Sequence, residues 1–168
     1  MRSRVRAAGH AVHPMLMVFP LGLLVTAAVF DLLQRITGGS DWAIAAAYTM
    51  AAGVLGGLVA GLTGWADWAL SVPKGTRARR VGLVHGAINS LVLALFALSW
   101  VLRLGEPGWA PGWTAVIVSW LGALLLGVGG WLGGELVERL SISVDEVAQP
   151  DATSSLSGHQ QRFRAARA

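Results

Sequence analysis

Apolar residues along the chain fall into four long runs that are separated by short polar stretches. The runs cover residues 14–36, 42–72, 81–103 and 112–139. Each is at or above the ~20 residues with which a helix crosses the hydrocarbon core of a bilayer. The first run, which follows His13, is too long and too apolar for a helix at a water-exposed surface. The pattern therefore predicts four membrane-spanning helices.

The connections between the runs are short and rich in turn formers, at residues 38–41, 72–75 and 106–112. Short connections make consecutive helices antiparallel neighbours. We therefore expect an all-α fold, an integral membrane four-helix bundle in up-down-up-down order, over residues 13–140. Residues 1–12 form a basic segment before it. Residues 141–168 contain too few apolar side chains to build a core, which predicts a disordered cytoplasmic tail.

Composition agrees with a chain whose main solvent is lipid. Only 13% of the residues are charged and 54% are hydrophobic, whereas a soluble domain has roughly 25% charged residues. The net charge is +4, but the basic residues lie in the ends of the chain and one loop, which argues against a nucleic-acid groove. The chain has no cysteine, which excludes disulfides, thiolate metal sites and cysteine nucleophiles.

The distribution of lysine and arginine predicts the orientation. Only Arg35 and Arg103 fall on one side of the predicted bundle. The other side carries Arg2, Arg4, Arg6, Lys74, Arg77, Arg79, Arg80, Arg139, Arg162, Arg164 and Arg167. Basic residues concentrate on the cytoplasmic side of membrane proteins. We therefore expect a protein of the plasma membrane with both termini in the cytoplasm.

Polar side chains inside the runs are few, and each is costly in lipid unless it has a partner. His13, Asp67, His85 and Glu135 all fall within roughly 10 Å of one membrane depth, because a helix rises 1.5 Å per residue. Asn89 follows His85 by one turn. Asp31 lies near the outer end of the first run, where we expect a contact at the level of the helix cap.

The order of these residues repeats along the chain. His13 opens the first helix pair and Gly64-Trp65-Ala66-Asp67 closes it, while His85 opens the second pair and Gly130-Trp131-Leu132-Gly133-Gly134-Glu135 closes it. This order predicts two parallel hairpins around a pseudo-two-fold axis along the membrane normal. It also predicts one polar centre, in which Asp67 faces His85 and Trp65 or Trp131 lines the site.

Several motifs resemble those of the small membrane proteins known as domain of unknown function 2231. They are His13-Pro14-Met15, Phe19-Pro20 with Gly22-Leu23, Gly64 with Asp67-Trp68, His85 with Asn89, and residues 130–137. The resemblance covers about residues 10–144 and implies a four-helix membrane protein without an assigned activity. Some relatives resemble fusions to Rieske-type iron–sulfur modules, which implies redox work. The family supplies no catalytic residues to carry over.

Three interpretations of the polar residues remain open. In the first, His13 and His85 are axial ligands of haem b in a redox module, near Asn89 and Trp131. The basic loop, with Lys74, Arg77, Arg79 and Arg80, would then hold the propionates. In the second, a divalent metal binds His13, Asp67, His85 and Glu135, or these residues relay protons. In the third, they only hydrogen-bond helices together.

Glycines at three- and four-residue spacing in the second and fourth runs either pack helices together or make room for a flat cofactor. The sequence shows no nucleophile elbow, phosphate loop or zinc-protease motif, so it supports no enzyme activity. The expected partners are the lipid bilayer, a redox or other membrane protein, and a second copy of the chain.

Overall fold

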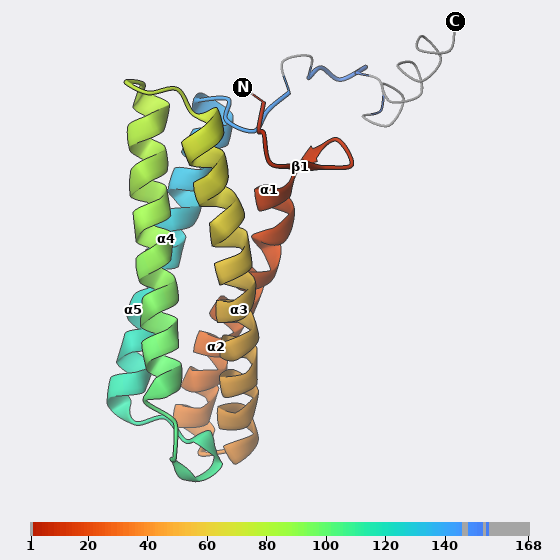
Figure 1. Ribbon diagram of the computed structural model, residues 1–168. Coiled ribbons are helices and arrows are strands. Elements are labelled where there is room, and N and C mark those ends of the chain that lie inside the picture. The colour runs from red at the N-terminus through yellow and green to blue at the C-terminus, as the bar shows by residue number, and fades with distance from the viewer. Residues whose placement is uncertain (1, 146–147, 153, 155–168) are drawn as a thin grey trace, which may run out of the picture.

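The computed structural model describes residues 2–145, 148–152 and 154, and within them it is built almost entirely of helix (Figure 1). The elements are α1 (Val12–Leu16), α2 (Val18–Thr37), α3 (Ser40–Ser71), α4 (Arg77–Val101) and α5 (Trp113–Gly134). A 3-10 turn, η1 (Pro107–Trp109), precedes α5, and a π-helical turn, η2 (Glu135–Arg139), continues it. Among these residues, four helical stretches are long and apolar enough to cross a membrane, which confirms the predicted fold class.

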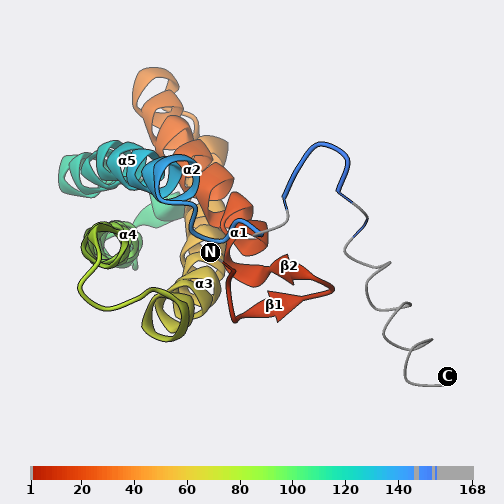
Figure 2. The same ribbon diagram turned by 90° about the horizontal axis from the view of Figure 1, so that it is seen from above.

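Consecutive long helices run in opposite directions, and the N-terminus lies at the end of the bundle at which α5 finishes (Figure 1). Seen from above, α3 lies beside α2 and α4, and α5 packs against α4 and α2 (Figure 2). The helices therefore surround a common interior. The connections at residues 38–39 and 102–112 lie at the far end, which we call the loop end. The opposite end is the terminal end.

The first predicted helix is divided in two at Met17, between α1 and α2. Pro20 lacks the backbone N–H that would bond to the carbonyl of Leu16, so the helical ladder is interrupted there. Before α1, β1 (Arg6–Ala7) pairs with β2 (His10–Ala11) in a small antiparallel hairpin. The sequence pattern did not predict these strands, because each is only two residues long.

The connection between α3 and α4 is held by its own side chains. The Thr76 hydroxyl accepts a hydrogen bond from the Arg79 amide at 3.1 Å and caps α4. The Arg79 guanidinium donates to the carbonyls of Trp68 and Val72, at 2.7 and 2.8 Å, and so satisfies the end of α3. It also lies 3.8 Å from the centroid of the Trp68 ring. This connection fixes how α3 and α4 meet at the terminal end.

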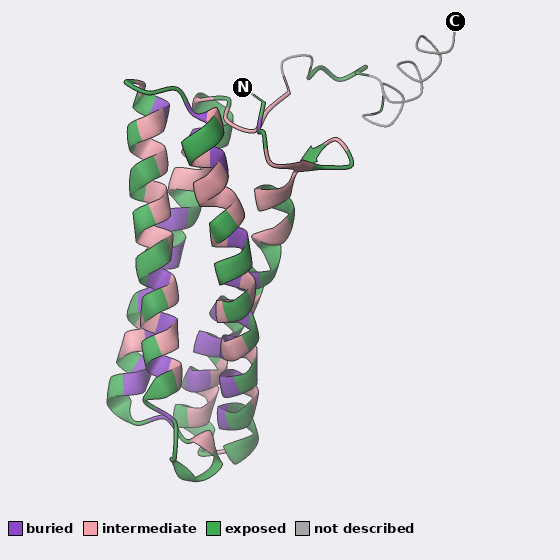
Figure 3. Ribbon diagram, in the orientation of Figure 1, coloured by how far each residue is buried: buried purple, intermediate pink, exposed green. Residues whose placement is uncertain are grey.

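The core lies where the four helices face each other, around Leu24, Met50, Val92, Phe96 and Leu126. Buried positions follow the inward sides of the helices, whereas exposed positions cover their outward sides (Figure 3). Large apolar side chains such as Phe19, Tyr48, Leu62 and Trp131 are more than half exposed on the outside. An outer surface of this kind is suited to lipid and not to water.

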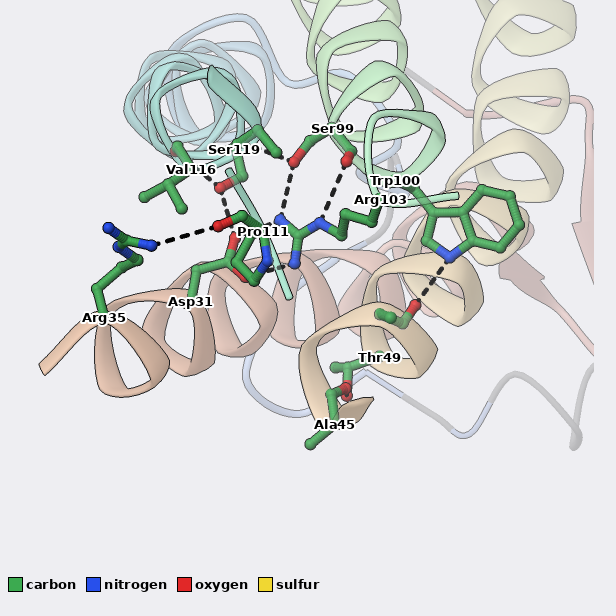
Figure 4. Close-up of polar contacts among 12 residues, drawn as sticks. Asp31, Arg35, Ala45, Thr49, Ser99, Trp100, Arg103, Pro111, Val116 and Ser119 are labelled. Carbon is green, nitrogen blue, oxygen red and sulfur yellow. Dashed lines mark hydrogen bonds and ion pairs between the residues drawn. The ribbon is translucent and has the colours of Figure 1, made fainter. Parts of the chain in front are cut away.

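Near the loop end, Asp31 and Arg103 form a fully buried ion pair (Figure 4). Both nitrogens of the guanidinium fork donate to the two carboxylate oxygens at 2.6 Å. Ser119 donates to the same carboxylate at 2.7 Å, and Ser99 accepts from Arg103 at 2.9 Å. The expected cap-level contact of Asp31 was wrong, because the carboxylate binds Arg103 and Ser119 between the helices. The chain folds back after α4, and a carboxylate buried between helices requires a buried cation.

Residues 141–145 lie against the terminal end of the bundle. The Ile142 amide donates to the Leu136 carbonyl at 2.9 Å, and the Asp145 carboxylate lies 3.3 Å from Arg2 and 3.5 Å from Arg6. The predicted disordered tail therefore has an ordered beginning. Most of the remaining tail, residues 146–147, 153 and 155–168, lies outside the described residues.

Candidate functional site

A cavity of about 490 Å³ opens inside the terminal half of the bundle, between α1, α2, α3, α4 and α5. Its walls are mainly apolar and include glycines from α3, α4 and α5. Its polar lining comprises Ser3, His13, Asp67, Ser71, His85, Asn89, Ser90, Glu138 and Ser143. The size falls in the range of small-molecule and cofactor sites, which are also mostly apolar with a few polar groups.

His13 and His85 reach this cavity from α1 and α4. The Nδ1 atom of His13 lies 2.8 Å from the carbonyl oxygen of Ala60 in α3. The Nδ1 atom of His85 lies 2.9 Å from the carbonyl oxygen of Gly129 in α5. A carbonyl oxygen only accepts hydrogen bonds, so Nδ1 carries the proton in both rings. With Nδ1 bonded to a carbonyl, Nε2 is the ring nitrogen that would bind a metal or accept a hydrogen bond.

The two histidine rings lie close together and form a pair. Their centroids are 6.4 Å apart and their planes are inclined by 88°. Two elements far apart in sequence therefore present two similar ligands to one cavity. The predicted depth of His13 and His85 agrees with this arrangement.

Glycines make the space that the histidines occupy. A Cβ atom at Gly64 would lie 2.8 Å from the His13 ring, and one at Gly133 would lie 3.2 Å from the His85 ring. A Cβ at Gly129 would lie 2.7 Å from the Asn89 side chain. By contrast, a Cβ at Gly61 would meet nothing within 4 Å. Some glycines thus admit neighbouring side chains, as helix packing requires, and others leave the cavity open.

The two acids expected beside the histidines have other partners. One carboxylate oxygen of Asp67 accepts from the Ser71 hydroxyl at 2.6 Å and from the backbone amides of Arg4 and Val5 at 3.0 and 3.5 Å. Glu135 lies 2.6 Å from Arg77 in an ion pair. The segment before α1 folds back over the bundle, and its backbone amides at Arg4 and Val5 bind Asp67. The four predicted residues therefore do not form one polar centre.

Two further expectations concern the site residues. Asn89 lines the cavity and donates to the carbonyl of His85, one turn before it, at 2.8 Å. Trp131 is 68% exposed and lies outside the cavity lining, whereas Trp65 is part of it. Among the described residues, no group of three or more histidine, aspartate or glutamate side chains is placed to hold a metal ion.

Sequence reasoning missed the groups that orient the histidines and the segment that covers the cavity. The Ala60 and Gly129 acceptors are backbone carbonyls, which no side-chain pattern reveals. Ser3 belongs to the segment predicted only as basic, residues 1–12, yet it is 5% exposed and lines the cavity. The repeated order, in which each helix pair opens with a histidine and closes with a glycine-containing segment and an acid, was the signal that pointed to the histidine pair.

Comparison with family models matches residues 9–146 to the family described as "Predicted membrane protein (DUF2231)". No curated protein and no solved structure matches the chain. The matched residues include all four spans, both histidines and Asp67. The resemblance seen in the sequence is thereby confirmed, and the chain belongs to the DUF2231 family of predicted membrane proteins.

Proposed function

We propose that the protein is a membrane redox module that holds haem b between His13 and His85. The observation that carries this proposal is the state of the two imidazoles. Both line one cavity, and both donate Nδ1–H to a backbone carbonyl. Metal-binding histidines commonly make this second hydrogen bond, because it fixes the tautomer, orients the ring and makes Nε2 a better ligand.

The separation of the rings is compatible with one metal ion between them. If both Nε2 atoms faced one metal ion at about 2.0–2.1 Å, the two rings would lie on either side of it, about 6 Å apart. The observed separation is 6.4 Å. Perpendicular ring planes are compatible with this coordination, because each ligand is free to rotate about its own metal–nitrogen bond.

The number of ligands favours haem over a bare metal ion. A zinc ion in a protein takes three or four protein ligands, whereas a haem iron receives four nitrogens from its own macrocycle and requires only axial ligands from the protein. In the described residues the histidine pair has no third ligand, since Asp67 and Glu135 are bound elsewhere. The same contacts argue against a proton relay through these acids.

The cavity and its surroundings meet two further requirements of a haem site, which are open space and basic side chains. Open space beside Gly61 suits a flat group. The loop between α3 and α4 brings basic residues to the terminal end, where propionates would lie. Arg77 is paired with Glu135 and Arg79 binds the end of α3, so the exposed Lys74 and Arg80 are the side chains that we assign to the propionates.

A second candidate is a structural role without any cofactor. The histidine bonds join α1 to α3 and α4 to α5, and an interhelical hydrogen bond in a membrane contributes roughly 0.6–2 kcal/mol. In this case the histidines would only hold the helices together, and their removal would lower stability without loss of a bound group.

A visible spectrum distinguishes these candidates. The protein is produced with a haem precursor in the medium, purified in detergent, and analysed for a Soret band and for metals. We expect a Soret band that His13→Ala and His85→Ala abolish, while both variants still insert in the membrane. His10→Ala is the matched control, because His10 is exposed in β2 and lies outside the cavity lining.

Three outcomes would contradict the haem proposal. Bound metal without a Soret band would favour a metal site, and neither metal nor Soret band would favour the structural role. A Soret band that persists in both histidine variants would place the haem elsewhere.

We further propose that the protein lies in the plasma membrane with cytoplasmic termini, where a redox partner would approach the terminal end.

A further inference from the structure

We propose that the two segments that flank the helical bundle form a lid over the cavity and that Asp67 and Asp145 act as its latches. The lid consists of residues 2–7 and residues 141–145. It controls access from water to the histidine pair, and only the identity of what enters rests on the function proposed above. In the view from above, the N-terminus lies over the middle of the bundle (Figure 2).

The N-terminal arm is fastened to α3 by its backbone. The amides of Arg4 and Val5 donate to the Asp67 carboxylate, and the Arg4 amide also lies 3.0 Å from the Ser71 hydroxyl. Ser71 donates to the same carboxylate. Ser3, next to these amides, is 5% exposed and lines the cavity. The arm therefore covers the mouth of the cavity and does not lie on the outer surface.

The C-terminal arm reaches the same mouth from α5. Ile142 and Ser143 are part of the cavity lining. The Asp145 carboxylate then lies within 3.5 Å of both Arg2 and Arg6. These ion pairs connect the two arms directly. A displacement of either arm thus removes a wall of the cavity and also breaks a contact of the other arm.

The two latches differ in strength, so we expect them to release in a fixed order. Asp67 is 8% exposed and accepts several hydrogen bonds, whereas the side chain of Asp145 is 34% exposed. An exposed ion pair is weak and is screened by salt. The β1–β2 hairpin stays closed through the Val12 amide, which donates to the Val5 carbonyl at 3.0 Å. We therefore expect Asp145 to release first and the N-terminal arm to move as a unit.

A single cysteine inside the cavity measures this opening. Gly61 lines the cavity and has open space around an added Cβ, and the chain has no native cysteine. The full-length Gly61→Cys protein in detergent is exposed to a charged, water-soluble maleimide, and the rate of labelling is followed by mass. The same rate is measured with Asp67→Ala or Asp145→Ala added. Glu138→Gln is the matched control, because Glu138 is an acid that lines the same cavity but is not one of the two latches.

We expect Asp67→Ala to raise the labelling rate by about tenfold, which corresponds to about 1.4 kcal/mol, because it removes the buried acceptor of the Arg4 and Val5 amides. Asp145→Ala should raise it by a smaller factor, and high salt should imitate that variant. Glu138→Gln should leave the rate at the parental value. Equal rates in all four proteins would overturn the lid, as would an equal increase in the control.

Failure of the lid and failure of the proposed function give different results. The labelling experiment uses protein without haem, so the labelling rate depends only on the arms and the cavity. Faster labelling in the latch variants together with a missing Soret band would retain the lid and reject haem. A Soret band with unchanged labelling rates would retain haem and reject the lid. Asp145 lies outside the helices, so its variant keeps the test valid if Asp67→Ala does not fold.

Discussion

Replacement of Arg103 by methionine should be among the most destabilising single changes in the bundle. The guanidinium is 0% exposed and binds Asp31 through both nitrogens of its fork. The variant would leave the Asp31 carboxylate buried with Ser119 as its remaining hydrogen-bond donor. An uncompensated buried charge of this kind costs about 3–5 kcal/mol. We expect the free energy of unfolding to fall by that amount.

The double variant Asp31→Leu/Arg103→Met should recover most of this loss. Well-packed apolar residues in place of a buried ion pair are often neutral, or stabilising by about 1–4 kcal/mol. The neighbouring hydroxyls keep acceptors, since Ser119 also lies 2.9 Å from the Val116 carbonyl and Ser99 donates to Ala115 at 2.7 Å. The double-mutant cycle should therefore show a coupling energy of several kcal/mol.

Equilibrium unfolding in mixed detergent micelles, followed by circular dichroism, measures these values. Arg35→Met is the matched control, because Arg35 is an exposed arginine at the same end whose guanidinium lies 4.2 Å from the Trp113 ring. A cation–π contact of this kind contributes about 0.5–1 kcal/mol. If Arg103→Met cost no more than Arg35→Met, or if the two single losses simply added, the buried pair would not hold α2 to α4 and α5.

Three further predictions concern the glycines, the orientation and the tail. Gly64→Ala should lower thermal stability and displace the His13 ring, because its Cβ would lie 2.8 Å from that ring, whereas Gly61→Ala should be tolerated; melting curves of both variants in detergent give the comparison. With cytoplasmic termini, an impermeant thiol reagent on intact cells should label single cysteines in the loops at the loop end and leave those at the terminal end unlabelled; the reverse pattern would invert the orientation. The cysteines replace Ser40 and Gly108 at the loop end and Gly75 at the terminal end, and a further one replaces Ser157 in the tail. Truncation after Asp145 should leave expression and melting temperature near the parental values, because the later residues offer little apolar surface.

The sequence was sufficient to predict the helices, because lipid demands long apolar runs and closed backbone hydrogen bonding. The four predicted spans agree with the observed ones to within a few residues, apart from the break at Met17 and the earlier start of α4 at Arg77. Hydropathy is a property of side chains averaged over many positions. It therefore indicates where a helix lies but not where a proline divides it.

The partners of the polar residues were much harder to predict. Depth in the membrane correctly grouped His13 with His85, but depth contains no information on which way a side chain faces. Asp67 was assigned to a histidine, although backbone amides of Arg4 and Val5 bind it. Such amides are present at every residue and leave no mark in the sequence. Arg103 was counted among the basic residues of the outer side, and only the fold shows that it is buried against the Asp31 carboxylate.

The recurrence of the histidine contacts has a consequence for the origin of the chain. Each helical hairpin contributes one histidine, one accepting carbonyl and one glycine beneath the ring: His13 with Ala60 and Gly64, and His85 with Gly129 and Gly133. Duplication of one ancestral hairpin would produce two hairpins of equal orientation without any inversion in the membrane. A homodimer of one ancestral hairpin would thus already have contained the complete pair. Halves of the present chain, separated between α3 and α4 and expressed together, should reassemble the same pair of rings.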